Sequence, residues 1–248
     1  MEWTDSGTVI GARLHGETSA IIEVFTAEHG RQAGMVRGGA SRKMVAMLQP
    51  GSEVQVVWRA RLDEHLGSFS VEPLRSRAAL LEDRSGLAGL NAVCAMLRMA
   101  LPERDPHPGL FRTTTALLAA MEAGRPAAAG DMPDWAGQYL RWELALLEDA
   151  GFALDLGRCA VTGSREDLAY VSPRTGRAVS RAGAGEWADR LLPLPQALLG
   201  QGPVTALDLQ QGLALTRHFL TRAFAPLRPS LALPDARNRL VALLDRAT

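Results

Sequence analysis

Two adjacent glycines with basic residues on both sides form the part of this sequence best suited to bind an anion. Arg37 precedes Gly38 and Gly39, and Arg42 and Lys43, the only lysine of the chain, follow them. Glycine tolerates positive φ and lets a backbone approach closely. Arginine and lysine neutralise phosphates and release counterions, which gives salt-sensitive binding that ignores base sequence. The segment therefore indicates a contact for a phosphate backbone.

A solvated loop is the alternative interpretation of the same residues, and composition alone favours it because basic loops are common. Further bases that could extend the basic surface lie in the strands predicted next, at Arg59, Arg61, Arg75 and Arg77. Aromatic rings that could stack on bases are few. Phe25, Trp58 and Phe69 are the candidates, and Trp58 has the pattern of a core residue. Any affinity for nucleic acid is therefore expected to be mainly electrostatic.

The charge of the whole chain hides a local asymmetry. Lys+Arg and Asp+Glu both total 27 among the 248 residues. Residues 1–30 carry five acids and one base, a net −4, whereas residues 31–77 carry eight bases and four acids, a net +4. A neutral protein can thus still present a basic face.

No known catalytic motif occurs in the sequence, which contains no GxSxG, no HExxH and no Walker A segment. The five histidines are isolated from one another, and Cys94 falls on the apolar side of a predicted helix, as a small buried residue would. The protein is therefore predicted not to be an enzyme, although catalytic groups that meet only in space would escape this test.

Cys159 lies in a knuckle-like turn, but the other positions of a zinc knuckle lack ligands. The residue three positions later is Thr162, and a second knuckle would fall on Ser180 and Gly183. Zinc ribbons need two such pairs of thiolates. We expect a metal-free hairpin, no cofactor and no bound zinc.

The secondary structure that positions these residues is predicted to change from strands to helices near residue 80. Before it, five strand-like runs alternate with turns at the spacing of a small barrel. In one of them Val54, Val56 and Trp58 face one way, and Gln55, Val57, Arg59 and Arg61 the other. Residues 41–48 predict a short helix between the third and fourth strands. This is the arrangement of an OB-fold, which we assign to residues 1–79.

Residues 80–248 are predicted to form a helical domain. Apolar residues at helical spacing mark helices within residues 85–101, 109–124, 134–151, 205–227 and 234–244. Trp135, Tyr139, Trp142 and Leu146 form one such stripe. A β-hairpin is expected within residues 156–182, with strands around Tyr170 and Val179. The fold class is thus α+β.

Two cysteines do not describe a disulfide framework, so a reducing, cytoplasmic compartment is expected. The acidic N-terminus lacks the apolar core of a signal peptide, and no apolar run is long enough for a membrane span.

An ordered set of segments resembles the RecO family of bacterial DNA-repair proteins, over roughly Asp5 to Leu244. The segments are GTVIGARLHGETSAIIEVFTAEHGRQAGMVRGGASRK, LQPGSEVQVVWRAR, ELALLEDAGFALDLGRCAVTG, AYVSPRTGRAVSR and RLLPLP. The resemblance implies an N-terminal OB-fold and a helical C-terminal domain. Many members carry a four-cysteine zinc knuckle, of which only Cys159 remains here.

The resemblance also implies a function. Members of the family are recombination mediators: they bind single- and double-stranded DNA, anneal complementary strands and partner with RecR. They recognise the acidic C-terminal tail of single-stranded DNA-binding protein (SSB) and help to load RecA, and they act in the cytoplasm at the nucleoid. The DNA-binding residues implied in this sequence are Arg37, Arg42, Lys43, Arg59, Arg61, Arg75 and Arg77.

Three other functions stay open from the sequence. The barrel could bind RNA, the protein could be a scaffold that contacts only proteins, or the Cys159 region could belong to a zinc hydrolase or nuclease, which the missing ligands oppose.

Overall fold

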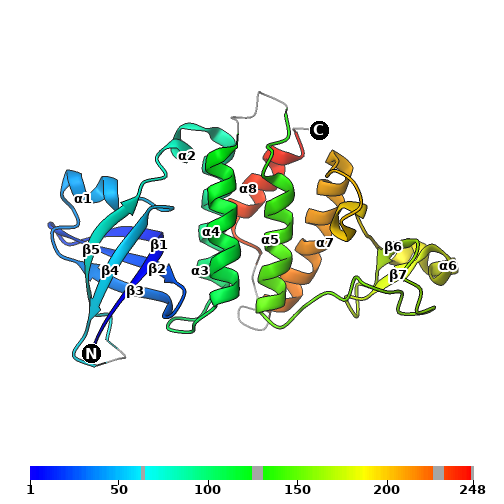
Figure 1. Ribbon diagram of the computed structural model, residues 1–248, viewed down its shortest axis with the longest axis horizontal. Helices are drawn as coiled ribbons and strands as arrows, with labels where there is room; N and C mark the ends of the chain where they lie inside the picture. Colours follow the sequence, from blue (N-terminus) through cyan, green and yellow to red (C-terminus); the bar gives the residue numbers. More distant parts are fainter. Residues whose placement is uncertain (63–64, 125–130, 226–231, 247–248) are drawn as a thin grey trace. The chain divides into compact units, whose positions relative to one another are not determined.

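The computed structural model describes residues 1–62, 65–124, 131–225 and 232–246 (Figure 1). The chain divides into two compact units, Met1–Ala123 and Gly124–Thr248. The predicted boundary after residue 79 lies inside the first unit, so an independently folding barrel of residues 1–79 stays a prediction.

The first unit is built on a closed five-stranded barrel, as predicted. Its strands are β1 (Glu2–His15), β2 (Ser19–Thr26), β3 (Gly30–Val36), β4 (Glu53–Arg59) and β5 (Ser68–Arg75). They are joined in the order β1-β2-β3-β5-β4, and β4 pairs with β1. All pairs are antiparallel except β3 with β5, which meet in parallel at Met35 and Ser68. The predicted short helix is α1 (Arg42–Met47), between β3 and β4.

The long strand β1 closes the barrel because it serves two neighbours. Its residues 2–8 pair with β4 and its residues 7–15 with β2, with a register shift between Val9 and Gly11. Alternation places one side of each strand inside. In β4, Val54, Val56 and Trp58 are buried in the core, as predicted.

Three helices complete the first unit: α2 (Ala79–Glu82), α3 (Arg84–Ala100) and α4 (Pro108–Ala123). Helix α3 packs on β1 and α4 packs on β2. Residues Ile10 and Ile21, which are outside the core cluster of the barrel, are therefore also buried. Phe25 meets Phe111 of α4 edge to face, with 5.4 Å between ring centroids. The barrel thus has a second apolar face, and helices cover it.

The second unit contains α5 (Ala136–Asp149), α7 (Ala206–Phe224) and α8 (Asp235–Leu244), which confirm the helices predicted there. The stripe of Trp135, Tyr139, Trp142 and Leu146 is buried, as expected. Helix α7 begins with a capping box, in which Thr205 and Asp208 satisfy each other's backbone amides. Among the residues that the structure describes, no helix is both long and apolar enough to cross a membrane.

A buried ion pair joins these helices. Glu143 of α5 accepts hydrogen bonds from the Arg237 guanidinium of α8, at 2.7 Å from Nε and 2.9 Å from Nη2. Tyr139 donates to the same carboxylate, as does Thr216 of α7. Burial by itself would lower the pKa of Arg237, but the Glu143 carboxylate outweighs that effect and the pKa is raised. Both charges are therefore satisfied inside the unit.

A small sheet follows α5 in the chain. The predicted hairpin consists of β6 (Leu168–Val171) and β7 (Ala178–Ser180), with Tyr170 opposite Val179. The two-residue strand β8 (Leu192–Pro193) adds a third member that is too short to show an alternating pattern in sequence. Short helices lie between and after these strands: α6 (Arg181–Ala184), η1 (Gly185–Arg190) and η2 (Gln196–Leu199).

Candidate nucleic-acid interface

The glycine pair shapes the loop between β3 and α1. Gly38 has a φ of +70°, which favours glycine. Gly39 packs so closely on β2 that an added Cβ would lie 2.7 Å from the Cβ of Ala20. The amide of Ala40 donates to the carbonyl of Thr18 at 3.1 Å, which ties this loop to the turn between β1 and β2. Ser41 then caps α1.

The basic residues in this loop and at the start of α1 are exposed, and none has an ionic partner among the described residues. Arg37, Arg42 and Lys43 all lie at the surface. Within the described part of the chain, none of the three has a carboxylate at ion-pair distance. Arg61, just after β4, is likewise exposed and without a described ionic partner. Among the residues that the structure describes, no carboxylate competes with an external anion for these four charges.

The remaining predicted bases on the strands are already paired. Arg59 donates to Glu2 at 2.7 Å, and this hydrogen bond lowers the pKa of Glu2. Arg75 lies 2.7 Å from Glu122. Both arginines are exposed, but each faces a carboxylate.

Arg77 requires a correction to the predicted surface. Its side chain is only 1% exposed, and it donates to Glu53 of β4 and to Glu122 of α4. A buried guanidinium held by two carboxylates does not reach a phosphate. Arg77 therefore joins the barrel to its helices and does not belong to an exposed basic face.

Arg13, near the end of β1, adds a cation that the sequence analysis missed. It is exposed, and it borders the same surface as Gly39 and α1. Residues 1–30 have a net charge of −4, so the sequence did not indicate a basic contact in this segment, although Arg13 belongs to it. The turn after β1 provides the missing signal, since the loop between strands one and two of an OB-fold commonly contacts nucleic acid.

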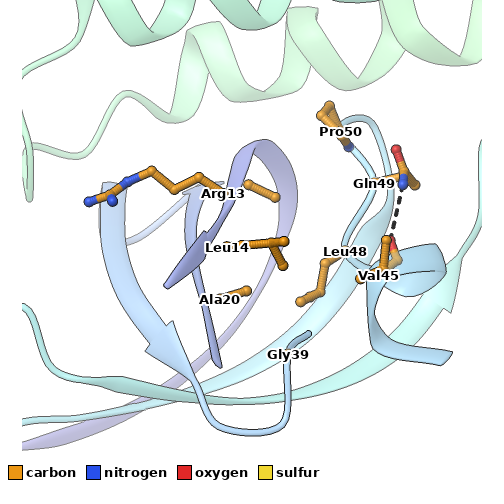
Figure 2. A pocket seen from close by; sticks show the side chains of 9 residues that line it. Arg13, Leu14, Ala20, Gly39, Val45, Leu48, Gln49 and Pro50 are labelled. Atoms are coloured by element: carbon orange, nitrogen blue, oxygen red, sulfur yellow. Dashed lines mark hydrogen bonds between the residues drawn. The ribbon is translucent and has the colours of Figure 1, made fainter. Parts of the chain in front are cut away.

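A half-open hollow of about 160 Å³ lies between the end of β1 and α1. Its lining includes Leu14, Ala20, Val45 and Leu48, with Arg13 and Gly39 at its margin. Figure 2 shows Leu14 directed towards Leu48 and Val45, while the Arg13 guanidinium extends away from them. Gln49 donates to the carbonyl of Val45 at 3.1 Å. The hollow is thus mainly apolar with cations nearby.

The aromatic candidates for base stacking do not lie at the surface. Phe25, Trp58 and Phe69 are all buried. Trp58 is a core residue, as predicted, and its indole Nε1 donates to the carbonyl of Leu66 at 3.2 Å. Stacking on these three rings is therefore excluded in this structure.

The four knuckle positions meet in the second unit, but they do not fit a zinc ion. Gly183 offers no ligand atom, and an added Cβ would lie 2.8 Å from the Sγ of Cys159. That sulfur already accepts hydrogen bonds from the Ser180 amide at 3.2 Å, the Ser180 hydroxyl at 3.3 Å and the Thr162 amide at 3.4 Å. Burial opposes ionisation of the thiol, yet these hydrogen bonds lower its pKa to about 6. The Sγ atom of Cys159 is therefore held by hydrogen bonds from the protein and not by coordination to a metal.

In the described ranges, histidines and carboxylates meet in pairs and not in larger clusters. There, no three His, Cys, Asp or Glu side chains gather as a metal site would require. His29 lies 3.2 Å from Asp5 and stacks on Trp3, with ring centroids 4.0 Å apart. Cys94 is buried, as predicted, and burial raises its pKa to about 12.

Comparison with known proteins covers the whole chain. Residues 1–77 match the family model described as Recombination protein O N terminal, and residues 81–231 match Recombination protein O C terminal. A DNA repair protein RecO of Cereibacter sphaeroides is 63% identical over 247 residues, with 100% of each chain covered. Proteins of the same name from Ruegeria sp. and Dinoroseobacter shibae are 51% and 48% identical, with 99% or more of each chain covered.

Proposed function

Because the chain belongs to the RecO family of DNA repair proteins, we propose that it is a recombination mediator that binds single- and double-stranded DNA and anneals complementary strands. The observation that carries the proposal is the exposed charge of Arg37, Arg42 and Lys43 on an OB-fold barrel, with no ionic partner among the described residues. Arg13, which lines the same hollow as Gly39 and α1, extends this basic surface. Arg61 is proposed as a further contact because it is exposed, and Arg59 and Arg75 as weaker contacts because each already has a carboxylate.

Annealing requires two polyanions to approach each other. A basic face lowers their mutual repulsion without selecting a base sequence, since phosphate contacts position a strand but do not specify it. Arg37 in the loop before α1, with Arg42 and Lys43 at the start of α1, suits this task, because none of them faces a carboxylate among the described residues. The protein is proposed to hold one strand there while a second strand pairs with it.

We propose that the partners are RecR and the acidic C-terminal tail of SSB, and that the complex helps to load RecA onto SSB-coated single strands. The family resemblance supports these partners. A tail of that kind needs an apolar pocket beside a basic residue, and we propose that this pocket lies in the helical part of the chain.

We further propose that the protein acts without catalysis and without a metal, in the cytoplasm at the nucleoid. Support for a metal-free knuckle comes from the donor set, because Thr162, Ser180 and Gly183 replace three thiolates.

Two matched double variants test the DNA surface. Arg42→Gln with Lys43→Gln removes two unpaired charges, whereas Arg59→Gln with Arg75→Gln removes two paired ones. The first variant is expected to weaken binding to single-stranded DNA and to flatten its salt dependence by about 0.7 in slope per lost phosphate contact. The second is expected to change both quantities far less. Fluorescence anisotropy across a salt series measures them.

Equal losses in the two variants would show that the loop is not the main contact. Matched DNA and RNA strands serve as a further arm, because tighter binding of RNA would favour an RNA-binding protein. Wild-type protein that binds neither nucleic acid at low salt, yet still binds protein partners, would favour a scaffold.

A further inference from the structure

The hollow between β1 and α1 lies within the proposed DNA surface but is not explained by phosphate contacts. Leu14 is 65% exposed and Val45 is 40% exposed, and both line it. Exposed apolar side chains that gather around a concave surface mark a binding site more often than scattered ones do. The cations bind the outside of a strand, so these apolar groups need a different part of the ligand.

We infer that this hollow takes one unstacked pyrimidine base of a single strand, an inference that rests on the proposed DNA-binding function. The charge of the surroundings favours an anionic ligand, since Arg13 borders the hollow and Arg42 and Lys43 share α1 with Val45. A nucleotide combines this negative charge with a flat, largely apolar ring. Duplex DNA keeps its bases stacked inside, so only a single strand can offer one.

Size and position agree with this ligand. The volume of about 160 Å³ is close to the roughly 150 Å³ of an engineered cavity that binds benzene, a six-membered ring like that of a pyrimidine. The hollow also adjoins the turn between β1 and β2, one of the loops with which OB-folds bind oligonucleotides. Figure 2 shows Leu14 on one side of it, opposite Leu48 and Val45.

Neighbouring residues then contact different parts of the nucleic acid. Arg42 and Lys43 hold phosphates on any nucleic acid, whereas Leu14 and Val45 contact a base and so act on single strands alone. One base held out of the stack would fix the position of the strand on the barrel. The remaining bases stay free to pair with a complementary strand.

The test compares an oligothymidylate strand with an abasic strand of equal length, which has the same phosphates but no bases. Wild-type protein is expected to bind the thymidylate strand about fivefold more tightly, the lower end of what one base contributes at an aromatic site. Leu14→Ser and Val45→Ser are expected to bind both strands alike, at the abasic level. Leu74→Ser is the matched control, because Leu74 is a 56% exposed leucine of β5 outside the hollow.

Each contrary outcome has a distinct meaning. Equal binding of the two strands by the wild type would overturn this inference and leave the proposed function standing. An equal loss in Leu74→Ser would also overturn it. Failure of the wild type to bind any strand would overturn the proposed function itself. If the two strands bind alike and an acidic peptide with a phenylalanine binds wild type but not Leu14→Ser, the hollow belongs to a protein partner instead.

Discussion

At the scale of single residues, the Sγ atom of Cys159 accepts hydrogen bonds from the Ser180 amide, the Ser180 hydroxyl and the Thr162 amide. These donors stabilise the thiolate and lower the pKa of Cys159 to about 6. The Ser180 hydroxyl also accepts a hydrogen bond from the amide of Gly183 at 3.1 Å, which caps α6. One sulfur thereby connects both turns of the knuckle, as a zinc ion would.

The lowered pKa of Cys159 should make the stability of the protein depend on pH. The ordinary pKa of the thiol is 9.0 and its pKa in the folded protein is about 6. The stabilisation is therefore complete above pH 9 and is lost as the pH falls towards 6. The difference in unfolding free energy between wild type and Cys159→Ser should grow with pH in this window, by at most about 1.4 kcal/mol per pH unit. Urea unfolding at several pH values measures it.

Cys94 supplies the control for this prediction. Burial raises its pKa to about 12, so its thiol stays protonated well above neutral pH. The difference between wild type and Cys94→Ser should be constant from pH 6 to about 8, below the ordinary thiol pKa. A constant difference for Cys159→Ser as well would contradict a folded-state thiolate.

Residue-level prediction succeeded where local sequence determines the environment. The glycine pair and the bases beside it identified an exposed loop, because turns and charges are local features. Burial and pairing are not local. Arg77 looks like its exposed neighbour Arg75 in sequence, and both contact Glu122 of α4, yet only Arg77 is buried, with Glu53 of β4 as a second partner. Arg13 was missed because acids precede and follow it in sequence, so the segment looked acidic. In the structure those acids do not line the hollow beside Arg13.

At the scale of elements, α8 is held in the second unit by a charge as well as by apolar packing. Arg237 of α8 forms an ion pair with Glu143 of α5. The same guanidinium donates a hydrogen bond to the carbonyl of Leu213 in α7 at 3.0 Å. Arg237→Ala should lower the free energy of unfolding by about 3–5 kcal/mol, because it leaves the buried carboxylate without a counter-charge. Denaturant unfolding provides the measurement.

Arg239→Ala is the matched control, since Arg239 is an exposed arginine of the same helix. Its effect should stay within about 0.5 kcal/mol. The double variant Glu143→Leu, Arg237→Met should lose less stability than Arg237→Ala, because no buried charge remains. A double variant as unstable as the single one would mean that shape, not charge, fixes α8.

Elements with a strong period were predictable from sequence, and those without one were not. Strand β4 alternates in two-residue steps, and turn residues bound the other barrel strands. Helices α5 and α7 repeat their apolar residues at helical spacing, so each of these elements was found. Strand β8 has two residues and α6 has four, too few to express any period. The pairing of Met35 with Ser68, which closes the barrel, could not be predicted from sequence either, because it joins strands far apart in the chain.

At the scale of the molecule, the barrel and its three helices form one compact unit. A fragment of residues 1–123 should therefore unfold at a higher temperature than a fragment of residues 1–79. The shorter fragment exposes Ile10, Ile21 and Phe25, which contribute about 1.5–3 kcal/mol each when buried. It also deprives Arg77 of Glu122.

Circular dichroism melting of the two fragments makes this comparison. Equal midpoints would instead support the boundary after residue 79 and leave α3 and α4 without a stabilising role. Sequence favoured that boundary because the change from strands to helices is abrupt there. The two family models also meet there, at residues 77 and 81, whereas the compact unit extends to Ala123 because α3 and α4 pack on the strands.

The pairing of Glu143 with Arg237 also bears on the order in which the protein folds during synthesis. These residues are 94 positions apart. At about 5–20 residues per second, a ribosome needs roughly 5–20 seconds to proceed from one to the other. Throughout that interval the Glu143 carboxylate must remain in water. The nascent chain can therefore complete its barrel unit early, while the helices around Glu143 wait for α8 to emerge from the ribosome.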